Sequence, residues 1–93
     1  WYTFPTQVKA ALDRTYAFFF SNTPLKSLQS VLMAYAGEDN YTCFEGLVKT
    51  HQLMCDYLGW KNTDPLLVPG IYDAGAIKGT DGLAKAKELG KSL

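Results

Sequence analysis

The chain has 93 residues, of which 47% are hydrophobic and 14% aromatic, so it carries enough apolar side chains for a globular core. Nine Lys and Arg residues balance nine Asp and Glu residues without a basic run, which excludes the charge pattern of a nucleic-acid binder. Apolar runs stay well below the roughly 18 to 20 residues that span a bilayer, so we expect one domain, or part of one, of a soluble cytoplasmic protein.

The segment after Pro5 predicts an amphipathic helix, because proline is favoured in the first turn and apolar residues then recur at helical spacing. The helix is expected to end near residues 21–24. Within it, Asp13-Arg14 is expected to form a local or interhelical ion pair that positions the helix. The run Phe18-Phe19-Phe20 is a large apolar surface that the rest of a domain or another subunit must cover. The apolar face of the helix consists of Val8, Ala11, Leu12, Tyr16 and Phe19.

Residues 27–36 predict a β-strand. Its second half, residues 31–36, is almost continuously apolar, as in strands that helices cover on both faces. We therefore expect a central strand of a sheet. The run Gly37-Glu38-Asp39-Asn40 then turns the chain.

A second helix of about fifteen residues is expected to follow this turn. Thr42 and Glu45 have the spacing of a capping box, and Gly59 is placed to stop the helix. Cys43 and Cys55 would then lie about 18 Å apart on one helix, too far for a disulfide, so we expect free thiols. The predicted apolar face consists of Phe44, Leu47, Val48, His51, Cys55 and Leu58.

A second strand is expected at about residues 66–71, and a last helix is expected from Thr80 to a stop at Gly90. Pro65 and Pro69 cannot donate to a sheet, which favours an edge strand. The order helix, strand, helix, strand, helix predicts an α/β fold with a parallel sheet.

Several short runs of this sequence resemble the flavodoxin-like NADPH-dependent FMN reductases. The first fourteen residues, Trp1-Tyr2-Thr3-Phe4 through Asp13-Arg14, are similar to the segment after the third strand of that family. The end of the chain, Gly75-Ala76-Ile77-Lys78-Gly79-Thr80 and Glu88-Leu89-Gly90-Lys91, is similar to the family's last segment, with Ala76 where an acidic residue is usual. Two runs between these ends also resemble sequence motifs of the family, namely Phe44-Glu45-Gly46-Leu47 and Tyr57-Leu58-Gly59-Trp60.

The resemblance implies the C-terminal part of a flavodoxin-like, three-layer parallel sheet, with the fourth strand, the fifth strand and the stub of the third. Because two strands alone are rarely stable, it implies a partner in the N-terminal half of the same domain, where the loop for the FMN phosphate would lie. The implied activity is hydride transfer from NAD(P)H through FMN to a quinone, flavin or similar acceptor, by a homo-oligomer. The residues implied beside the flavin ring are Trp1, Tyr2, Thr3, Phe4, Gly37, Glu38 and Asp39.

Other interpretations stand beside this one. Glu38 and Asp39 are more often a solvated turn than a catalytic pair, and no acid or base is assigned. His51 is favoured as a hydrogen-bonded histidine at the edge of the core, and no metal-ligand spacing is present. The alternative functions are a non-catalytic flavodoxin-like electron carrier and a half-fold interaction module that pairs its open sheet edge with a partner.

Overall fold

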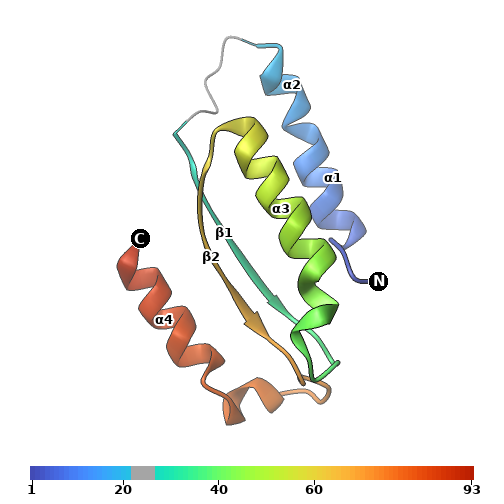
Figure 1. Cartoon of the computed structure of the whole chain (residues 1–93), viewed down its shortest axis with the longest axis vertical. Coiled ribbons are helices and arrows are strands. Elements are labelled where there is room, and N and C mark those ends of the chain that lie inside the picture. The colour runs from blue at the N-terminus through green and yellow to red at the C-terminus, as the bar shows by residue number, and fades with distance from the viewer. Residues whose placement is uncertain (22–26) are drawn as a thin grey trace.

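The computed structural model describes residues 1–21 and 27–93, and it confirms the predicted order of helices and strands (Figure 1). The predicted end of the first helix at residues 22–24 lies outside the described residues. The helices and strands are α1 Thr6–Arg14, α2 Tyr16–Phe19, β1 Gln29–Tyr35, α3 Glu45–Leu58, β2 Lys61–Val68 and α4 Gly82–Ser92. Two 3-10 turns, η1 Tyr41–Phe44 and η2 Ala76–Gly79, precede α3 and α4.

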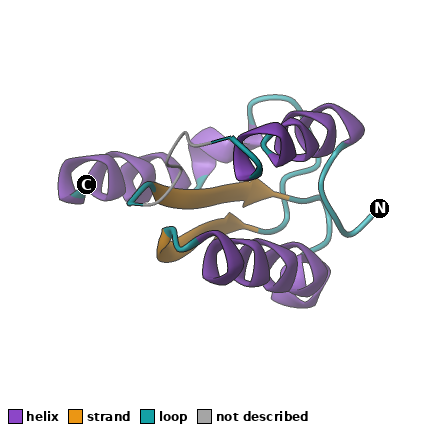
Figure 2. Cartoon of the chain, turned by 90° about the horizontal axis from the view of Figure 1, so that it is seen from above, coloured by secondary structure: helices purple, strands orange, loops and turns teal. Residues whose placement is uncertain are grey.

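The sheet consists of the parallel strands β1 and β2, with helices on both of its faces. Seen from above, α1 and α3 lie on one side of the strands and α4 lies on the other (Figure 2). This layering is the usual way in which a parallel sheet hides its apolar surfaces from water. None of the helices that the described residues form is long and apolar enough to cross a membrane.

The second strand begins earlier and ends earlier than residues 66–71, so its predicted bounds are wrong. Val31 pairs with Thr63 and Met33 pairs with Leu66, so two residues of β2 lie opposite one residue of β1. Pro65 falls in this bulge, where a residue without an N–H group disrupts the ladder least. The strand can therefore run through the proline from Lys61 to Val68.

The first helix is interrupted, whereas the sequence predicted one continuous helix. α1 ends at Arg14 and α2 begins at Tyr16. Between them, the Thr15 hydroxyl donates to the carbonyl of Leu12 at 2.6 Å, and the Thr15 N–H donates to the same oxygen at 3.0 Å. A side chain that competes for backbone carbonyls in this way favours a local break in the helix.

The start of α3 also differs from the prediction, because the capping box between Thr42 and Glu45 does not form. Residues 41–44 make the 3-10 turn η1, and Phe44 precedes the helix without a side-chain cap. Cys43 therefore lies in η1 and not in the helix, although both cysteines are free thiols as predicted. The stop at Gly59 is confirmed, since its φ of 71° is the left-handed conformation that glycine adopts readily.

The last helix begins at Gly82, two residues after Thr80, and it ends at Ser92, so the predicted stop at Gly90 is wrong. Thr80 still contributes, because its hydroxyl accepts the N–H of Gly82 at 3.2 Å. A Cβ on Gly82 would lie 2.9 Å from Cγ2 of the buried Val68. The glycine therefore allows the first turn of α4 to pack closely on β2.

The core lies mainly between the sheet and α3. Met33 and Tyr35 remain 63% and 69% exposed on the face that carries α4, so α4 covers only part of that face of β1. No described residue pairs with the second edge of β1, and its central position in a larger sheet stays a prediction. The buried residues are Leu32, Cys43, Phe44, His51, Cys55, Val68 and Gly82.

Candidate functional site

A pocket of about 320 Å³ lies at the carboxyl end of β1. It brings together the N-terminal segment, the end of β1 with the turn after it, and the start of α3. Ligands of open parallel sheets bind beyond the carboxyl ends of the strands, which makes this pocket the candidate site. Its lining consists of Trp1, Tyr2, Thr3, Ala34, Tyr35, Ala36, Gly37, Glu38, Cys43, Phe44 and Leu47.

Backbone hydrogen bonds from the segment after β2 hold the turn in place. The N–H of Ala36 donates to Val68 at 3.2 Å, and the N–H of Ile71 donates back to Ala36 at 2.8 Å. The N–H of Gly70 donates to the carbonyl of Glu38 at 2.8 Å, so the parallel pairing continues past the strands. These bonds fix the backbone that carries the Glu38 side chain.

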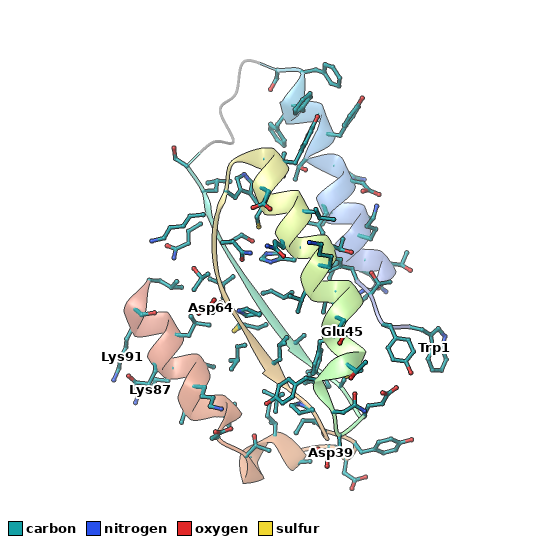
Figure 3. All side chains as sticks on the ribbon, in the orientation of Figure 1. Trp1, Asp39, Glu45, Asp64, Lys87 and Lys91 are labelled. Atoms are coloured by element: carbon teal, nitrogen blue, oxygen red, sulfur yellow. The ribbon has the colours of Figure 1, made fainter. Side chains whose placement is uncertain are left out.

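The N-terminal segment reaches the same turn through a side-chain contact. The Tyr2 hydroxyl donates a hydrogen bond to Oε1 of Glu38, and a Cβ on Gly46 would lie 2.9 Å from the carbonyl oxygen of Tyr2. Tyr2 has a φ of 59°, which is uncommon for a residue with a side chain and often occurs at functional sites. Trp1 is fully exposed and projects away from the ribbon (Figure 3).

The hydrogen bond from Tyr2 to Glu38 and the nearby carboxylate charge raise the pKa of the Tyr2 phenol above its ordinary value of 10.0. Burial, and then the charge of Glu38, raise the pKa of the Cys43 thiol. This thiol donates to the carbonyl oxygen of Asn40 at 3.1 Å. Both groups are therefore neutral near pH 7, and Cys43 does not supply a thiolate nucleophile.

Five of the seven residues predicted beside a ligand line this pocket, and two do not. Phe4 contributes to cavities beside α1 and α3. The side chain of Asp39 lies against Gly70, where its Oδ1 is 3.0 Å from the position of a Cβ. The other six residues of the lining were not predicted at the site, and Cys43 and Phe44 were missed because nothing in the sequence predicted the η1 turn.

His51 lies outside this pocket and is hydrogen-bonded, as predicted. Its side chain is 5% exposed, with Nε2 at 2.8 Å from Oγ of Ser30 and 3.5 Å from Sγ of Cys55. In the neutral ring, Nε2 can accept the hydroxyl proton of Ser30. The histidine thus joins α3 to β1 as a buried, satisfied polar group.

The free energy of unfolding should fall as the pH drops below about 6.5, the ordinary histidine pKa. Burial lowers the pKa of His51, so the unfolded chain takes up its proton at a higher pH than the folded protein does. The contribution of the neutral His51 ring to the free energy of unfolding is complete above the ordinary histidine pKa. It is lost progressively as the pH falls from that value toward the lowered pKa of the folded protein. Urea unfolding between pH 5.5 and 7.5 measures this slope.

The control for this pH dependence is His51→Gln, which keeps a hydrogen-bonding side chain but cannot titrate in this range. The chain has one histidine, so the variant should show a flatter dependence on pH. An unchanged slope in His51→Gln would contradict the assignment to His51.

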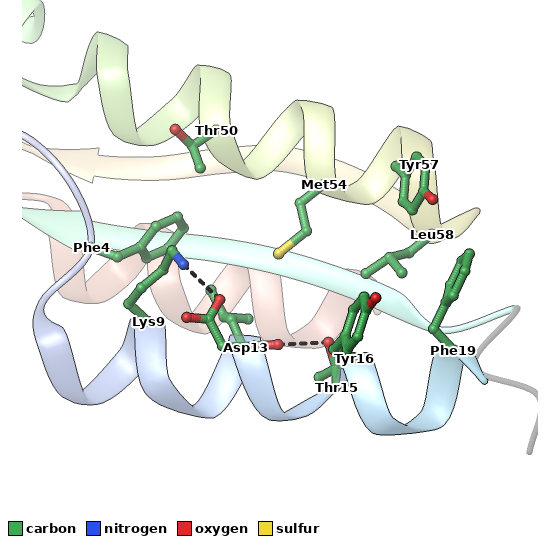
Figure 4. Close-up of a pocket in the computed structure, with 11 residues that line it drawn as sticks. Phe4, Lys9, Asp13, Thr15, Tyr16, Phe19, Thr50, Met54, Tyr57 and Leu58 are labelled. Atoms are coloured by element: carbon green, nitrogen blue, oxygen red, sulfur yellow. Dashed lines mark hydrogen bonds and ion pairs between the residues drawn. The ribbon is translucent and has the colours of Figure 1, made fainter. Parts of the chain in front are cut away.

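A second hollow, a groove of about 410 Å³, lies between the α1–α2 segment and α3 (Figure 4). Met54 points from α3 toward α1, and aromatic rings of Tyr16, Phe19 and Tyr57 stack at one end. Nζ of Lys9 lies 2.6 Å from Oδ1 of Asp13 on the same helix, so the ion pair expected at Asp13-Arg14 is a local one between Asp13 and Lys9. Because the two charged side chains of this groove pair with each other, neither is left to bind a charged ligand, and the pocket after β1 is the better candidate site.

Across residues 1–21 and 27–93, no group of three or more His, Cys, Asp or Glu side chains could hold a metal ion. No protein-family model, no curated protein and no solved structure matches the chain.

Proposed function

We propose that this chain is part of a flavin-dependent NAD(P)H oxidoreductase that passes a hydride from nicotinamide to FMN and on to a quinone, flavin or similar acceptor. The observation that carries the proposal is the meeting of residues 1–3 with Gly37 and Glu38 in one pocket at the carboxyl end of β1. These segments are distant in the sequence. They are also the segments that the resemblance to the FMN reductases implies beside the flavin ring.

The placement of the helices supports a flavodoxin-like fold. α1 and α3 lie on one face of the strands, while α4 returns over the other face. When successive right-handed crossovers add strands in the same direction across a parallel sheet, their helices lie on the same face of the sheet. A helix that follows the last strand forms no crossover and can cover the opposite face. β1 and β2 correspond in this proposal to the fourth and fifth strands of a doubly wound sheet.

The second edge of β1 supports an N-terminal half in the same domain. A cavity of about 760 Å³ lies between α1, β1 and α3, and Val8 and Leu12 of α1 line it with apolar atoms. An unpaired strand edge leaves backbone N–H and C=O groups without partners, which proteins avoid in their interiors. A further strand beside β1 would satisfy these groups and fill the cavity.

The pocket after β1 fits the ring of FMN and does not fit its phosphate. Tyr2 and Phe44 give it aromatic walls, and the single charged side chain in its lining is the carboxylate of Glu38, which repels a phosphate. The phosphate would be held by other residues of the domain. When bound, the flavin supplies the redox chemistry. The residues of this chain orient the ring and shield one side of it from water.

Two surface features agree with the proposed setting. Tyr16, Phe19, Phe20 and Tyr57 form an exposed aromatic cluster, and burying it against a second subunit fits the implied homo-oligomer. The free thiols fit a reducing compartment such as the cytoplasm.

The test uses the protein expressed from its complete gene. FMN titration should quench flavin fluorescence with saturation, and the loaded protein should oxidise NADH or NADPH, followed at 340 nm, when a quinone is present. Protein that neither binds FMN nor consumes nicotinamide would rule out the proposal.

The same assay separates the alternative functions. An electron carrier would bind FMN without consuming NAD(P)H. An interaction module, which the unpaired edge of β1 favours, would bind no flavin and would instead add a partner strand at that edge.

A further inference from the structure

The pocket after β1 combines aromatic rings with one uncompensated negative charge. Phe44 is buried at 3% exposure, Tyr2 is at the rim, and both line the pocket with Glu38. Among the residues that the structure describes, Glu38 forms no ion pair. Aromatic faces and a carboxylate both attract a cation, and flat rings stack on flat rings.

The Glu38 carboxylate is held in place. Oε1 accepts the hydroxyl of Tyr2, and Oε2 lies 3.5 Å from Nδ2 of Asn40. Both partners are neutral donors, so they orient the carboxylate without cancelling its charge. The raised pKa of the Tyr2 phenol keeps the hydroxyl protonated, and therefore keeps it a donor, through the neutral pH range.

The uncommon backbone conformation of Tyr2 also indicates that this side chain is held in place at the pocket. A φ of 59° costs free energy in a residue with a side chain and persists where surrounding contacts enforce it. Here the contacts are the bond to Glu38 and the close approach of the Tyr2 carbonyl to Gly46. These constraints hold an aromatic ring and a carboxylate side by side at the pocket.

We propose that the part of this pocket that the flavin ring leaves open binds planar aromatic cations, and that Glu38 favours the oxidised, positively charged form of a nicotinamide ring over neutral rings. The inference deepens the proposed function and rests on it only for the identity of the natural ligand. The preference for a cationic ring follows from Tyr2, Phe44 and Glu38 alone.

This preference bears on the direction of electron flow. When NAD(P)H reacts, the C4–H bond of its dihydronicotinamide ring breaks, and hydrogen leaves with two electrons for the flavin, which is reduced. The nicotinamide ring becomes a pyridinium cation. A fixed carboxylate stabilises the positive charge as it develops, which lowers the barrier for hydride release. Glu38 acts here through its charge and transfers no proton.

The test compares two ligands that share a ring, neutral nicotinamide and cationic 1-methylnicotinamide. Their dissociation constants are measured by calorimetry on protein from the complete gene, saturated with FMN and, separately, without added flavin. The wild-type protein should bind the cation more tightly by roughly three- to tenfold, the range expected for an exposed carboxylate and aromatic ring. The preference should shrink as salt is added.

Glu38→Gln should lower the ratio of the two dissociation constants to the smaller preference that the aromatic rings alone supply. Glu45→Gln removes the same charge at the first residue of α3, outside the pocket lining, and should leave the ratio at its wild-type value. Equal binding of both ligands by wild-type protein, or a ratio in Glu38→Gln that equals the wild-type ratio, would overturn the inference. Failure of FMN binding and NAD(P)H oxidation would instead overturn the proposed function, whatever the ratio.

Discussion

Replacing Phe44 with alanine should lower the free energy of unfolding by about 3–5 kcal/mol, the usual cost of truncating a buried aromatic side chain. The ring is 3% exposed and lies at the junction of η1 and α3. Truncation removes apolar area from the core and leaves a cavity beneath the pocket. Urea or guanidinium unfolding of the purified protein, followed by far-ultraviolet circular dichroism, measures the loss.

Tyr41→Ala is the matched control. Its ring centre lies 6.4 Å from that of Phe44 on the same short turn, but the side chain is 61% exposed. Surface truncations typically change stability by about 0.5 kcal/mol or less, so a small loss is expected here. Phe44→Leu keeps most of the apolar volume and should fall between the two. Equal losses for Phe44→Ala and Tyr41→Ala would show that Phe44 does not anchor the turn.

The importance of Phe44 illustrates what the sequence could and could not predict. Its place on an apolar helix face correctly indicated burial, since apolar spacing reflects the core. The capping-box pattern at Thr42 and Glu45 suggested a regular helix start, whereas residues 41–44 form a 3-10 turn that buries Phe44 and Cys43. Local capping patterns are weak signals, and tertiary packing can override them.

The bounds of β2 show a similar limit. Its first four residues, Lys61-Asn62-Thr63-Asp64, are polar, and most of them are exposed, so they carry no apolar strand signal. They are strand because they pair with β1, and the bulge at Pro65 resolves the conflict with proline. The sequence predicted the order of helices and strands, which is confirmed. It did not predict which residues of the two strands pair.

The resemblance to the FMN reductases implied that residues 1–4 and the turn after β1 would lie together at one site. In the structure, a hydrogen bond from Tyr2 to Glu38 joins the N-terminal segment to this turn. Which of the predicted side chains line the pocket depends on how each side chain is oriented. Phe4 turns toward the cavities beside α1, and Asp39 turns toward Gly70. Neither orientation has a signature in residue type or spacing.

Gly46→Ala should separate residues 1–3 from the pocket. The new Cβ would lie 2.9 Å from the backbone oxygen of Tyr2, and a backbone atom cannot give way as the end of a flexible side chain can. The segment must move, and the bond from Tyr2 to Glu38 should break. The pKa of Tyr2 should then fall back toward its ordinary value of 10.0, because that bond is the main cause of its rise.

Gly90→Ala is the control for this substitution, because it also places alanine in a helix but meets no atom within 4 Å. Alanine favours a helix over glycine by up to about 1 kcal/mol, so Gly90→Ala should stabilise the protein slightly and leave Tyr2 unchanged. NMR titration of ring-labelled tyrosine follows the pKa, and calorimetry with 1-methylnicotinamide should show weaker binding only in Gly46→Ala. Unaltered titration of Tyr2 in Gly46→Ala would mean that α3 can shift to accept the methyl group, and that the position of residues 1–3 does not depend on this glycine.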